Sequence, residues 1–456
     1  MANVTILQLP QAVGLTGTEQ IEGVQNNTSV RIPLNAIAAQ VPGVPGPPGP
    51  SGLTIPVGAD PTGILDSTVA MQNWANLGVL GQPLFLPPGN YKISSTLSFS
   101  GLSLICQGAG SNVSRIFQAT AGIPGIRLNI TGDGVATPCG YFSDIGIIGP
   151  AANPTDFQAG ILFDACRGFN TLRTDVGNFD IGYDFKNNCF NSSLYSPSCH
   201  RFNSCNIGIY LRGFDTQFNA GNDISIYDAI LSNKLGCVVV GPNSGGYHFF
   251  GGQLGTSGLT TNRDDLGAIM LGVAYDTVLQ TGVGSLTTGG CTADFSGLSI
   301  EGVNRMWFIQ SYDEDTCGFY NMGFTPSQTG ANAALGILKM QNAKNSQFDF
   351  GGCLSIQAGG ILQTAIASFA GGGSALCVRE GPWQQGSLTV NGSGVSTRVM
   401  QSLVQQSNAT SIGIGSVRRS NLPIQMLGQM WLRGSTSTGG VLQFCTDNTG
   451  TTWTAV

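Results

Sequence analysis

The sequence predicts an all-β solenoid, a stack of short parallel β-strands, and three observations carry that prediction. Glycine is unusually frequent, at 67 of 456 residues, when its usual share is roughly 7%. Charged residues make up only 10% of the chain, against about 25% in ordinary globular proteins. Short apolar runs recur between Gly- and Asn-rich turns at a spacing of roughly twenty residues.

The repeat is clearest between about residues 140 and 370. Gly160, Gly182 and Gly208 each open an apolar run and are separated by steps of 22 and 26 residues. In a solenoid each coil buries its inward residues against the next coil, so these steps indicate stacked coils. Roughly a dozen coils fit between residues 80 and 370 at that period.

Composition also excludes several classes of protein. A net charge of −6 with 41% hydrophobic residues is unlike a disordered chain, and it lacks the basic footprint of a nucleic-acid-binding protein. No run reaches 18 apolar residues, so we expect no membrane span. Met1–Leu9 has neither a basic nor an apolar region, so we expect no secretory signal. The 12 cysteines include no CxxC pair, which predicts buried free thiols and no metal or cofactor.

The chain divides into four predicted parts. Residues 1–40 form a small module that we expect to attach the protein to a larger particle. Residues 41–52 place glycine at 43, 46, 49 and 52 among prolines, the Gly-X-Y pattern of three chains winding together, although a stiff proline-rich linker is the alternative. Residues 53–370 form the solenoid. A hinge at Gly371–Ser374 precedes a β-rich tip, residues 371–456.

Residues 53–130 carry the most specific pattern. Asp66 is a good N-cap for a short amphipathic helix with Met71 and Trp74 on one face, ended by Gly78. A strand follows in the run Leu-Pro-Pro-Gly-Asn-Tyr from Leu86, and then a turn in the run Gly-Ala-Gly-Ser from Gly108.

This ordered run, over about 55 residues, resembles the opening of the pectate-lyase-like right-handed parallel β-helix found in bacteriophage tailspikes. One departure is Pro61, where that family often has glycine. The resemblance implies a homotrimeric tail fibre or tailspike with a short N-terminal capping helix. It also implies docking of the N-terminus on a phage tail or baseplate protein, a virion location after assembly in the host cytoplasm, and contact with a bacterial surface polysaccharide or lipopolysaccharide.

Candidate catalytic residues are sets of carboxylates, because glycosidic hydrolysis normally uses two of them. The sets are Asp264 with Asp265, Asp294 with Glu301, and Asp313, Glu314 and Asp315. Solvated turn acids or caps are the alternative interpretation of each set. A lyase would need a base and a cation beside it, and His200 with Arg201 is not a specific match.

Candidate glycan-binding residues combine aromatic faces with polar neighbours. They are Tyr247, His248, Trp307 and Tyr312, together with Arg418 and Arg419 in the basic C-terminal part. Packing in the core or between chains is the alternative for the aromatics. The preferred hypothesis is non-catalytic recognition of a surface glycan. A depolymerase of hydrolase type is the alternative, and a structural baseplate or tail component is the third.

Overall fold

The computed structural model divides the chain into two compact units, residues 1–53 and 54–456. The residues that it describes are 20–25, 28–33, 54–79, 81–131, 139–150, 158–187, 189–199, 205–212, 222–256, 267–276, 281–284, 290–303, 307–311, 315–326, 336–340, 347–351, 353–355, 365–369, 375–379, 390–391, 396–400, 430–435, 439–445 and 453–455. In the first unit, β1 (Gln20–Gln25) and β2 (Thr28–Pro33) form an antiparallel hairpin.

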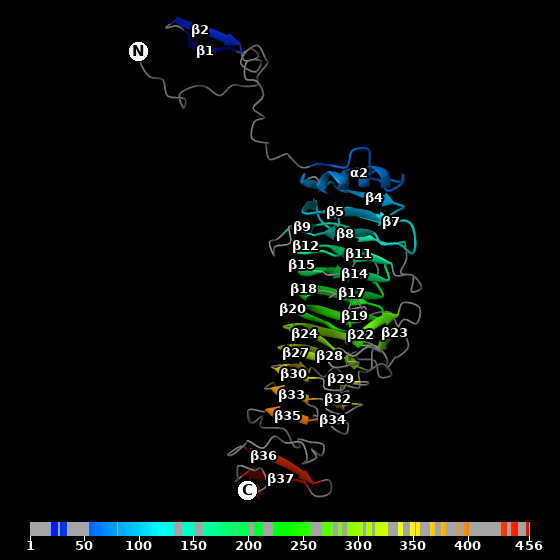
Figure 1. Ribbon diagram of the computed structural model, residues 1–456, viewed down its shortest axis with the longest axis vertical. Coiled ribbons are helices and arrows are strands. Elements are labelled where there is room, and N and C mark those ends of the chain that lie inside the picture. Colours follow the sequence, from blue (N-terminus) through cyan, green and yellow to red (C-terminus); the bar gives the residue numbers. More distant parts are fainter. Residues whose placement is uncertain are drawn as a thin grey trace. The chain divides into compact units, whose positions relative to one another are not determined.

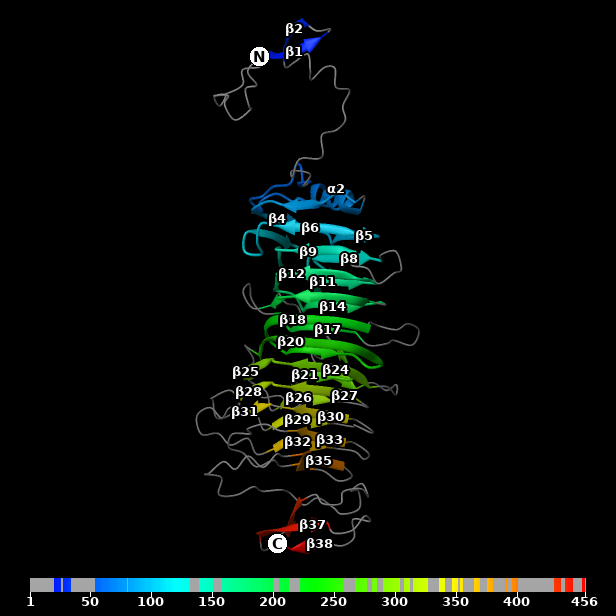
Figure 2. The same ribbon diagram turned by 90° about the vertical axis from the view of Figure 1, so that its left-hand side faces the viewer.

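The second unit contains a parallel β-helix whose coils present three ladders of strands (Figures 1 and 2). The first ladder contains β3 (Leu84–Leu86), β6 (Leu104–Gly108), β9 (Gly140–Ser143), β12 (Phe169–Leu172), β15 (Phe190–Tyr195), β18 (Asn222–Asn233), β20 (Ser244–Thr256), β24 (Cys291–Ser296), β27 (Thr316–Tyr320), β30 (Gln347–Gly351), β33 (Ala375–Arg379) and β35 (Ser396–Met400).

The second ladder follows the first after a sharp turn, and the long strands β18 and β20 run through both. Its other strands are β4 (Gly89–Ile93), β7 (Ser114–Gln118), β10 (Gly146–Ile148), β13 (Asp175–Gly177), β16 (Ser198–Cys199), β25 (Ser299–Val303), β28 (Gly323–Pro326) and β31 (Leu354–Ser355). Successive coils have a residue with positive φ at this turn. It is glycine in some coils (Gly251 with Gly252, and Gly297), and in others it is Asp144, Arg173, Ser196, Asp228 or Asn321.

The third ladder is an 11-stranded parallel sheet, close to the coil number that the repeat predicts. Its strands are β5 (Leu97–Gly101), β8 (Ile126–Ile130), β11 (Ala159–Asp164), β14 (Ile181–Lys186), β17 (Ile207–Leu211), β19 (Gly236–Val240), β21 (Gly267–Leu271), β26 (Trp307–Ser311), β29 (Gly336–Met340), β32 (Ala365–Phe369) and β34 (Val390–Asn391). Two antiparallel elements complete the unit: β22 (Val273–Asp276) with β23 (Thr281–Gly284), and β36 (Met430–Ser435) with β37 (Gly439–Cys445) and β38 (Trp453–Ala455).

The predicted boundary at residue 370 is wrong for the solenoid. β33 pairs with β30, and β35 pairs with β33, both in parallel, so the first ladder continues to Met400. The glycine run 371–373 therefore lies between two strands of successive ladders, β32 and β33, rather than between a solenoid and a separate tip.

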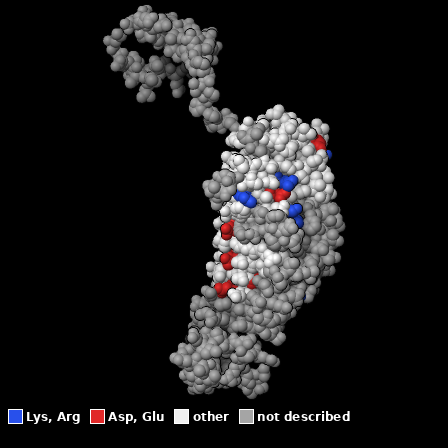
Figure 3. Space-filling model, in the orientation of Figure 1, with Lys and Arg blue, Asp and Glu red and all other residues white. Residues whose placement is uncertain are grey.

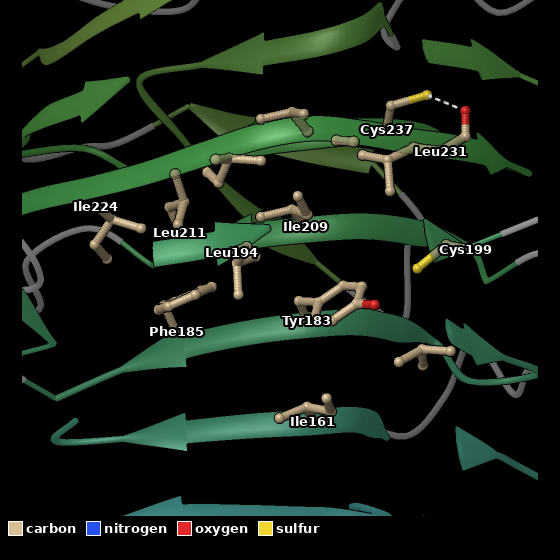
Figure 4. Close-up of a cluster of buried hydrophobic side chains, with 14 of the residues drawn as sticks. Ile161, Tyr183, Phe185, Leu194, Cys199, Ile209, Leu211, Ile224, Leu231 and Cys237 are labelled. Carbon is tan, nitrogen blue, oxygen red and sulfur yellow. Dashed lines mark hydrogen bonds between the residues drawn. The ribbon is translucent and has the colours of Figure 1, made fainter. Parts of the chain in front are cut away.

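The interior is filled by equivalent residues stacked from coil to coil. Ile161, Tyr183 and Ile209 occupy the same register on β11, β14 and β17, and all three are fully buried (Figure 4). The rings of Phe163 and Phe185 stack with their centroids 4.2 Å apart. Alternation along a strand gives each coil such inward residues, so neighbouring coils bury one another's apolar surface.

The glycine repeat has a steric cause. A Cβ at position 160 would stand 2.0 Å from Val176 Cγ1, and one at position 182 would stand 2.4 Å from Cys199 Sγ. At position 208 the obstacle is Asn233 Oδ1, at 2.5 Å. Only a residue without a side chain lets the third ladder start this close to inward residues of the second.

Helix α2 (Thr68–Val79) is the helix that the sequence predicts after Asp66. The Asp66 carboxylate accepts a hydrogen bond of 2.8 Å from the Thr68 N–H. Met71 and Trp74 are buried, and the Trp74 ring meets Phe99 of β5 edge-on at 6.0 Å. The apolar face of α2 therefore packs on the first coils.

The cysteines confirm the prediction of free thiols where the structure describes them. The structure describes the side chains of ten of the 12, none of these ten forms a disulfide, and all of them but the half-buried Cys139 are buried. Their packing replaces the covalent links that a disulfide scaffold would need.

Candidate functional site

The outward side of the first ladder presents two rows of side chains, because alternate residues of each strand face away from the core. In one row the register aligns Tyr195, Tyr227, Phe250, Ser296 and Tyr320 on successive coils. In the neighbouring row it aligns Ser193, Ser225, His248, Asp294, Gly318 and Asp349.

The first row begins as a stack of aromatic rings. The centroids of Tyr195 and Tyr227 lie 4.9 Å apart, and those of Tyr227 and Phe250 lie 5.2 Å apart, with the ring planes nearly parallel. Tyr195 and Phe250 are each 40% exposed. The rings thus cover one another's faces and show their edges to solvent.

Ser296 interrupts this row. It pairs with Phe250 on one side and with Tyr320 on the other, and its side chain is too short to continue the stack. We call this position the Ser296 break. The Tyr320 ring leans toward the neighbouring row, because a Cβ at Gly318 would stand 2.5 Å from Tyr320 Cε2. Phe250 therefore has one face stacked on Tyr227 and the other on the side of the break. The His248 ring lies beside it on the same strand, with centroids 6.2 Å apart and planes 19° apart.

The second row brings ionisable groups to the same place. His248 Nδ1 lies 3.5 Å from Asp294 Oδ2. Asp294 Oδ1 and the Tyr320 hydroxyl each lie 2.6 Å from the point where a Cβ of Gly318 would stand. The Tyr320 hydroxyl donates a long hydrogen bond of 3.5 Å to Asp349 Oδ2. Gly318 thus leaves the room in which the phenol lies between two carboxylates.

We define the β20–β30 face as the outward side chains of these four strands near the break: His248, Phe250, Asp294, Ser296, Tyr320 and Asp349. Its ionisable groups are two carboxylates, an imidazole and a phenol, and the Asp294 side chain is 48% exposed, against 37% for His248. Figure 3 shows acidic side chains one below another along this edge of the solenoid. Among the described residues the face is polar, aromatic and acidic.

Two of the predicted catalytic carboxylates, Glu301 and Asp315, lie outside the β20–β30 face. Glu301 is exposed on the second ladder, beyond the sharp turn, where it accepts hydrogen bonds from Gln253 Nε2 at 2.8 Å and from Ser299 Oγ at 2.7 Å. Asp315 is fully buried and accepts hydrogen bonds from the Cys291 N–H, at 3.0 Å, and from Ser311 Oγ. Asp315 therefore links the start of β24 to the end of β26, and solvent does not reach it.

The predicted glycan-binding residues of the described strands do not lie on one surface. Tyr247 points inward and is 1% exposed, whereas its neighbour His248 points outward, as the alternation of β20 requires. Trp307 is 7% exposed and stands between Gly267 and Gly336 in the third ladder. These two burials favour the packing alternative for Tyr247 and Trp307.

The remaining candidates fall outside the described residues. They are Asp264, Asp265, Tyr312, Asp313, Glu314, Arg418 and Arg419.

Sequence reasoning missed Tyr195, Tyr227, Tyr320 and Asp349. A signal was present, because six strands of the first ladder share a triplet: an outward polar or small residue, an inward apolar residue and a second outward residue. These triplets are Ser-Leu-Tyr at 193, Ser-Ile-Tyr at 225, His-Phe-Phe at 248, Asp-Phe-Ser at 294, Gly-Phe-Tyr at 318 and Asp-Phe-Gly at 349. Aligning the triplets instead of the glycines reveals both rows.

The described part of the chain contains no group of three or more His, Cys, Asp or Glu side chains that suits a metal ion. Nor does any helix within it have the length and apolar character to cross a membrane.

Comparison with known proteins gives a match in structure only. No protein-family model and no curated sequence matches the chain. A tailspike of an Acinetobacter phage superposes with a TM-score of 0.53 at 12% identity, covering 86% of this chain and 74% of that one. The catalytic unit of an α-1,3-glucanase from Streptomyces thermodiastaticus gives 0.50 at 14%, covering 77% and 68%.

A third structure, the enzymatically active domain of tailspike protein 2 of bacteriophage CBA120, gives a TM-score of 0.47 at 12% identity, covering 80% of this chain and 50% of that one. The first two likenesses establish the fold. The chain has the parallel β-helix architecture that phage tailspikes share with polysaccharide-acting enzymes, as the sequence resemblance implies.

Proposed function

We propose that the protein is a phage tailspike or tail fibre that attaches the virion to a bacterial surface polysaccharide or lipopolysaccharide. One observation carries the proposal: on a tailspike-like solenoid, the β20–β30 face gathers aromatic, hydroxyl and carboxylate side chains on one side of the molecule. Sugars are bound by aromatic surface combined with polar groups that fix their orientation.

The same proposal assigns the rest of the chain. Three chains assemble through the Gly-X-Y segment 41–52, residues 1–40 dock on a tail or baseplate protein, and α2 caps the solenoid. Arg418 and Arg419 add positive charge for anionic surface groups. Three weak sites per trimer then bind a repetitive polymer with high avidity. Light scattering of the full chain tests the trimer, since a 47.3 kDa particle would contradict it.

Affinity electrophoresis tests glycan binding. The purified full chain is run through native gels cast with polysaccharides from a panel of bacterial strains. We expect at least one polysaccharide to retard it, and Tyr227→Ala together with Phe250→Ala to reduce that retardation. Equal migration in every gel would contradict the proposal.

A depolymerase is the second candidate, and the pair Asp294 and Asp349 favours it. The two residues are separated by one coil, so their Cα atoms lie about 9.5 Å apart from strand spacing alone. Inverting glycosidases hold their carboxyl groups about 6.5–9.5 Å apart. Such a pair would protonate the leaving oxygen with one carboxyl group and activate water with the other.

Chromatography of the polymer over time separates the two candidates. Shortening of the polysaccharide by the wild type, lost in Asp294→Asn or Asp349→Asn, would identify this pair. Shortening that survives both changes would direct attention to Asp264 with Asp265, to Asp313 with Glu314, or to Glu301. Binding without shortening leaves recognition as the function.

A further inference from the structure

We propose that the Ser296 break binds one uncharged or amino-bearing pyranose ring of the surface glycan, stacked on the free face of Phe250, and that the face excludes sugars carrying a carboxylate. The inference rests on the proposed glycan-binding function and names the subsite and the substrate class.

The free face of Phe250 is the first reason. A sugar packs its C–H groups on the face of an aromatic ring rather than on its edge. In the row Tyr195–Tyr227–Phe250 the faces are largely used up in stacking, at 4.9 and 5.2 Å. Phe250 ends the stack and directs its second face toward Ser296, which cannot cover it.

The size of the break is the second reason. The stacked rings of this row show the space that one ring needs, because their centroids are 4.9 and 5.2 Å apart, close to the strand spacing of about 4.8 Å. Ser296 leaves one such position unfilled, and Tyr320 on the following coil leans away over Gly318. The unfilled position matches one flat six-membered ring, and a pyranose is a six-membered ring.

The polar groups beside the break are the third reason. Asp294 and Asp349 accept hydrogen bonds from sugar hydroxyls or an ammonium group, and charged acceptors make the stronger hydrogen bonds. The Tyr320 hydroxyl lies between them. A uronate at this position would bring a third negative charge beside two carboxylates, which like-charge repulsion disfavours.

The first experiment fills the break. Ser296→Phe continues the aromatic row with a ring at the spacing that its neighbours already use, so the coil keeps its packing. Thr292→Phe places the same ring on the same strand, at an exposed position outside the row, as the matched control. Bacterial surface polysaccharides, separated by anion exchange into neutral or cationic and acidic fractions, serve as probes in affinity electrophoresis.

We expect wild-type protein and Thr292→Phe to bind a neutral or cationic fraction, and Ser296→Phe to bind it at least about tenfold more weakly. Unchanged binding by Ser296→Phe, with an unchanged thermal midpoint and particle mass, would overturn the subsite. A change in particle mass would overturn it too, because the break would then be a contact between chains.

The second experiment tests the charge. Asp294→Asn and Asp349→Asn keep the shape of the side chains. We expect each to weaken binding of the neutral fraction, about tenfold where a charged hydrogen bond is lost, and the double variant to raise the relative affinity for acidic polymers. Wild-type binding to acidic fractions alone would refute this inference while leaving glycan attachment standing, whereas binding to no fraction would contradict both.

Discussion

Replacing Gly182 by alanine tests whether the glycine column is set by space between coils. Gly182 does not have a positive φ, so alanine fits its backbone conformation. Its Cβ, however, would stand 2.4 Å from Cys199 Sγ and 2.6 Å from the Gly208 carbonyl oxygen. Both atoms are in the buried interior, and the carbonyl belongs to the paired strand β17.

The expected loss of stability follows from these two contacts. Overpacking a well-packed core costs about 1–3 kcal/mol. The reduced freedom of the unfolded chain offsets about 0.4–1 kcal/mol of that when alanine replaces glycine at a compatible φ. The net destabilisation is about 1–2 kcal/mol, which lowers the midpoint of thermal unfolding by about 2–8 °C in a domain of a few hundred residues.

Thermal unfolding of the full chain, followed by circular dichroism at one fixed heating rate, measures the shift. Gly323→Ala is the matched control, because the nearest atom to its Cβ would be Ser299 Oγ at 3.8 Å. Cys199→Ala removes the sulfur, so Gly182→Ala should lose less stability in that background. Equal midpoints for Gly182→Ala and Gly323→Ala would refute the steric explanation.

Three further predictions concern charge and thiols. Hydrogen bonds from the backbone of Leu65, and from Thr62 and Ile64, lower the pKa of Asp60 to about 2. The stability that its carboxylate adds is therefore complete above the unfolded pKa of about 3.9 and is lost as the pH falls toward 2. Asp60→Asn should make the thermal midpoint fall less steeply over that pH range, and an equally steep fall would contradict this. Arg212→Met leaves the Asp184 side chain, which is 2% exposed, without its bidentate partner. The free energy of unfolding, measured in urea, should fall by about 3–5 kcal/mol. Adding Asp184→Asn should restore part of that loss, and no restoration would count against the ion pair as its cause. Burial raises the pKa of Cys106, so a thiol reagent should label it only after denaturant is added, and rapid native labelling would show that the first coils open.

Much of the fold could be predicted because its determinants are local in sequence. Asp66, Met71 and Trp74 carry the signal of α2 within one segment. The glycines at 160 and 182 mark successive coils because each coil needs the same absence of a side chain at the same place. Such requirements repeat, so a single sequence shows them.

The candidate site could be predicted less well, because it depends on register between coils. Tyr195, Tyr227 and Phe250 stack, yet they stand 32 and 23 residues apart, since segments of different length join the coils. The direction of a side chain also changes with each residue along a strand, so Tyr247 is buried and His248 is not. A cluster of acids or aromatics in sequence therefore says little about which of them meet solvent together.

The alternation of β20, β24, β27 and β30 has a consequence for how the protein can change. Phe249, Phe295, Phe319 and Phe350 point inward and stack at 4.6, 5.2 and 4.7 Å, while the residues beside them form the β20–β30 face. In each coil, the inward residue that stabilises the stack and the outward residues that meet solvent thus lie on opposite sides of one strand. Substitutions on the outward side can therefore change the chemistry of this face without disturbing the stack within, so the surface can diverge while the architecture stays constant.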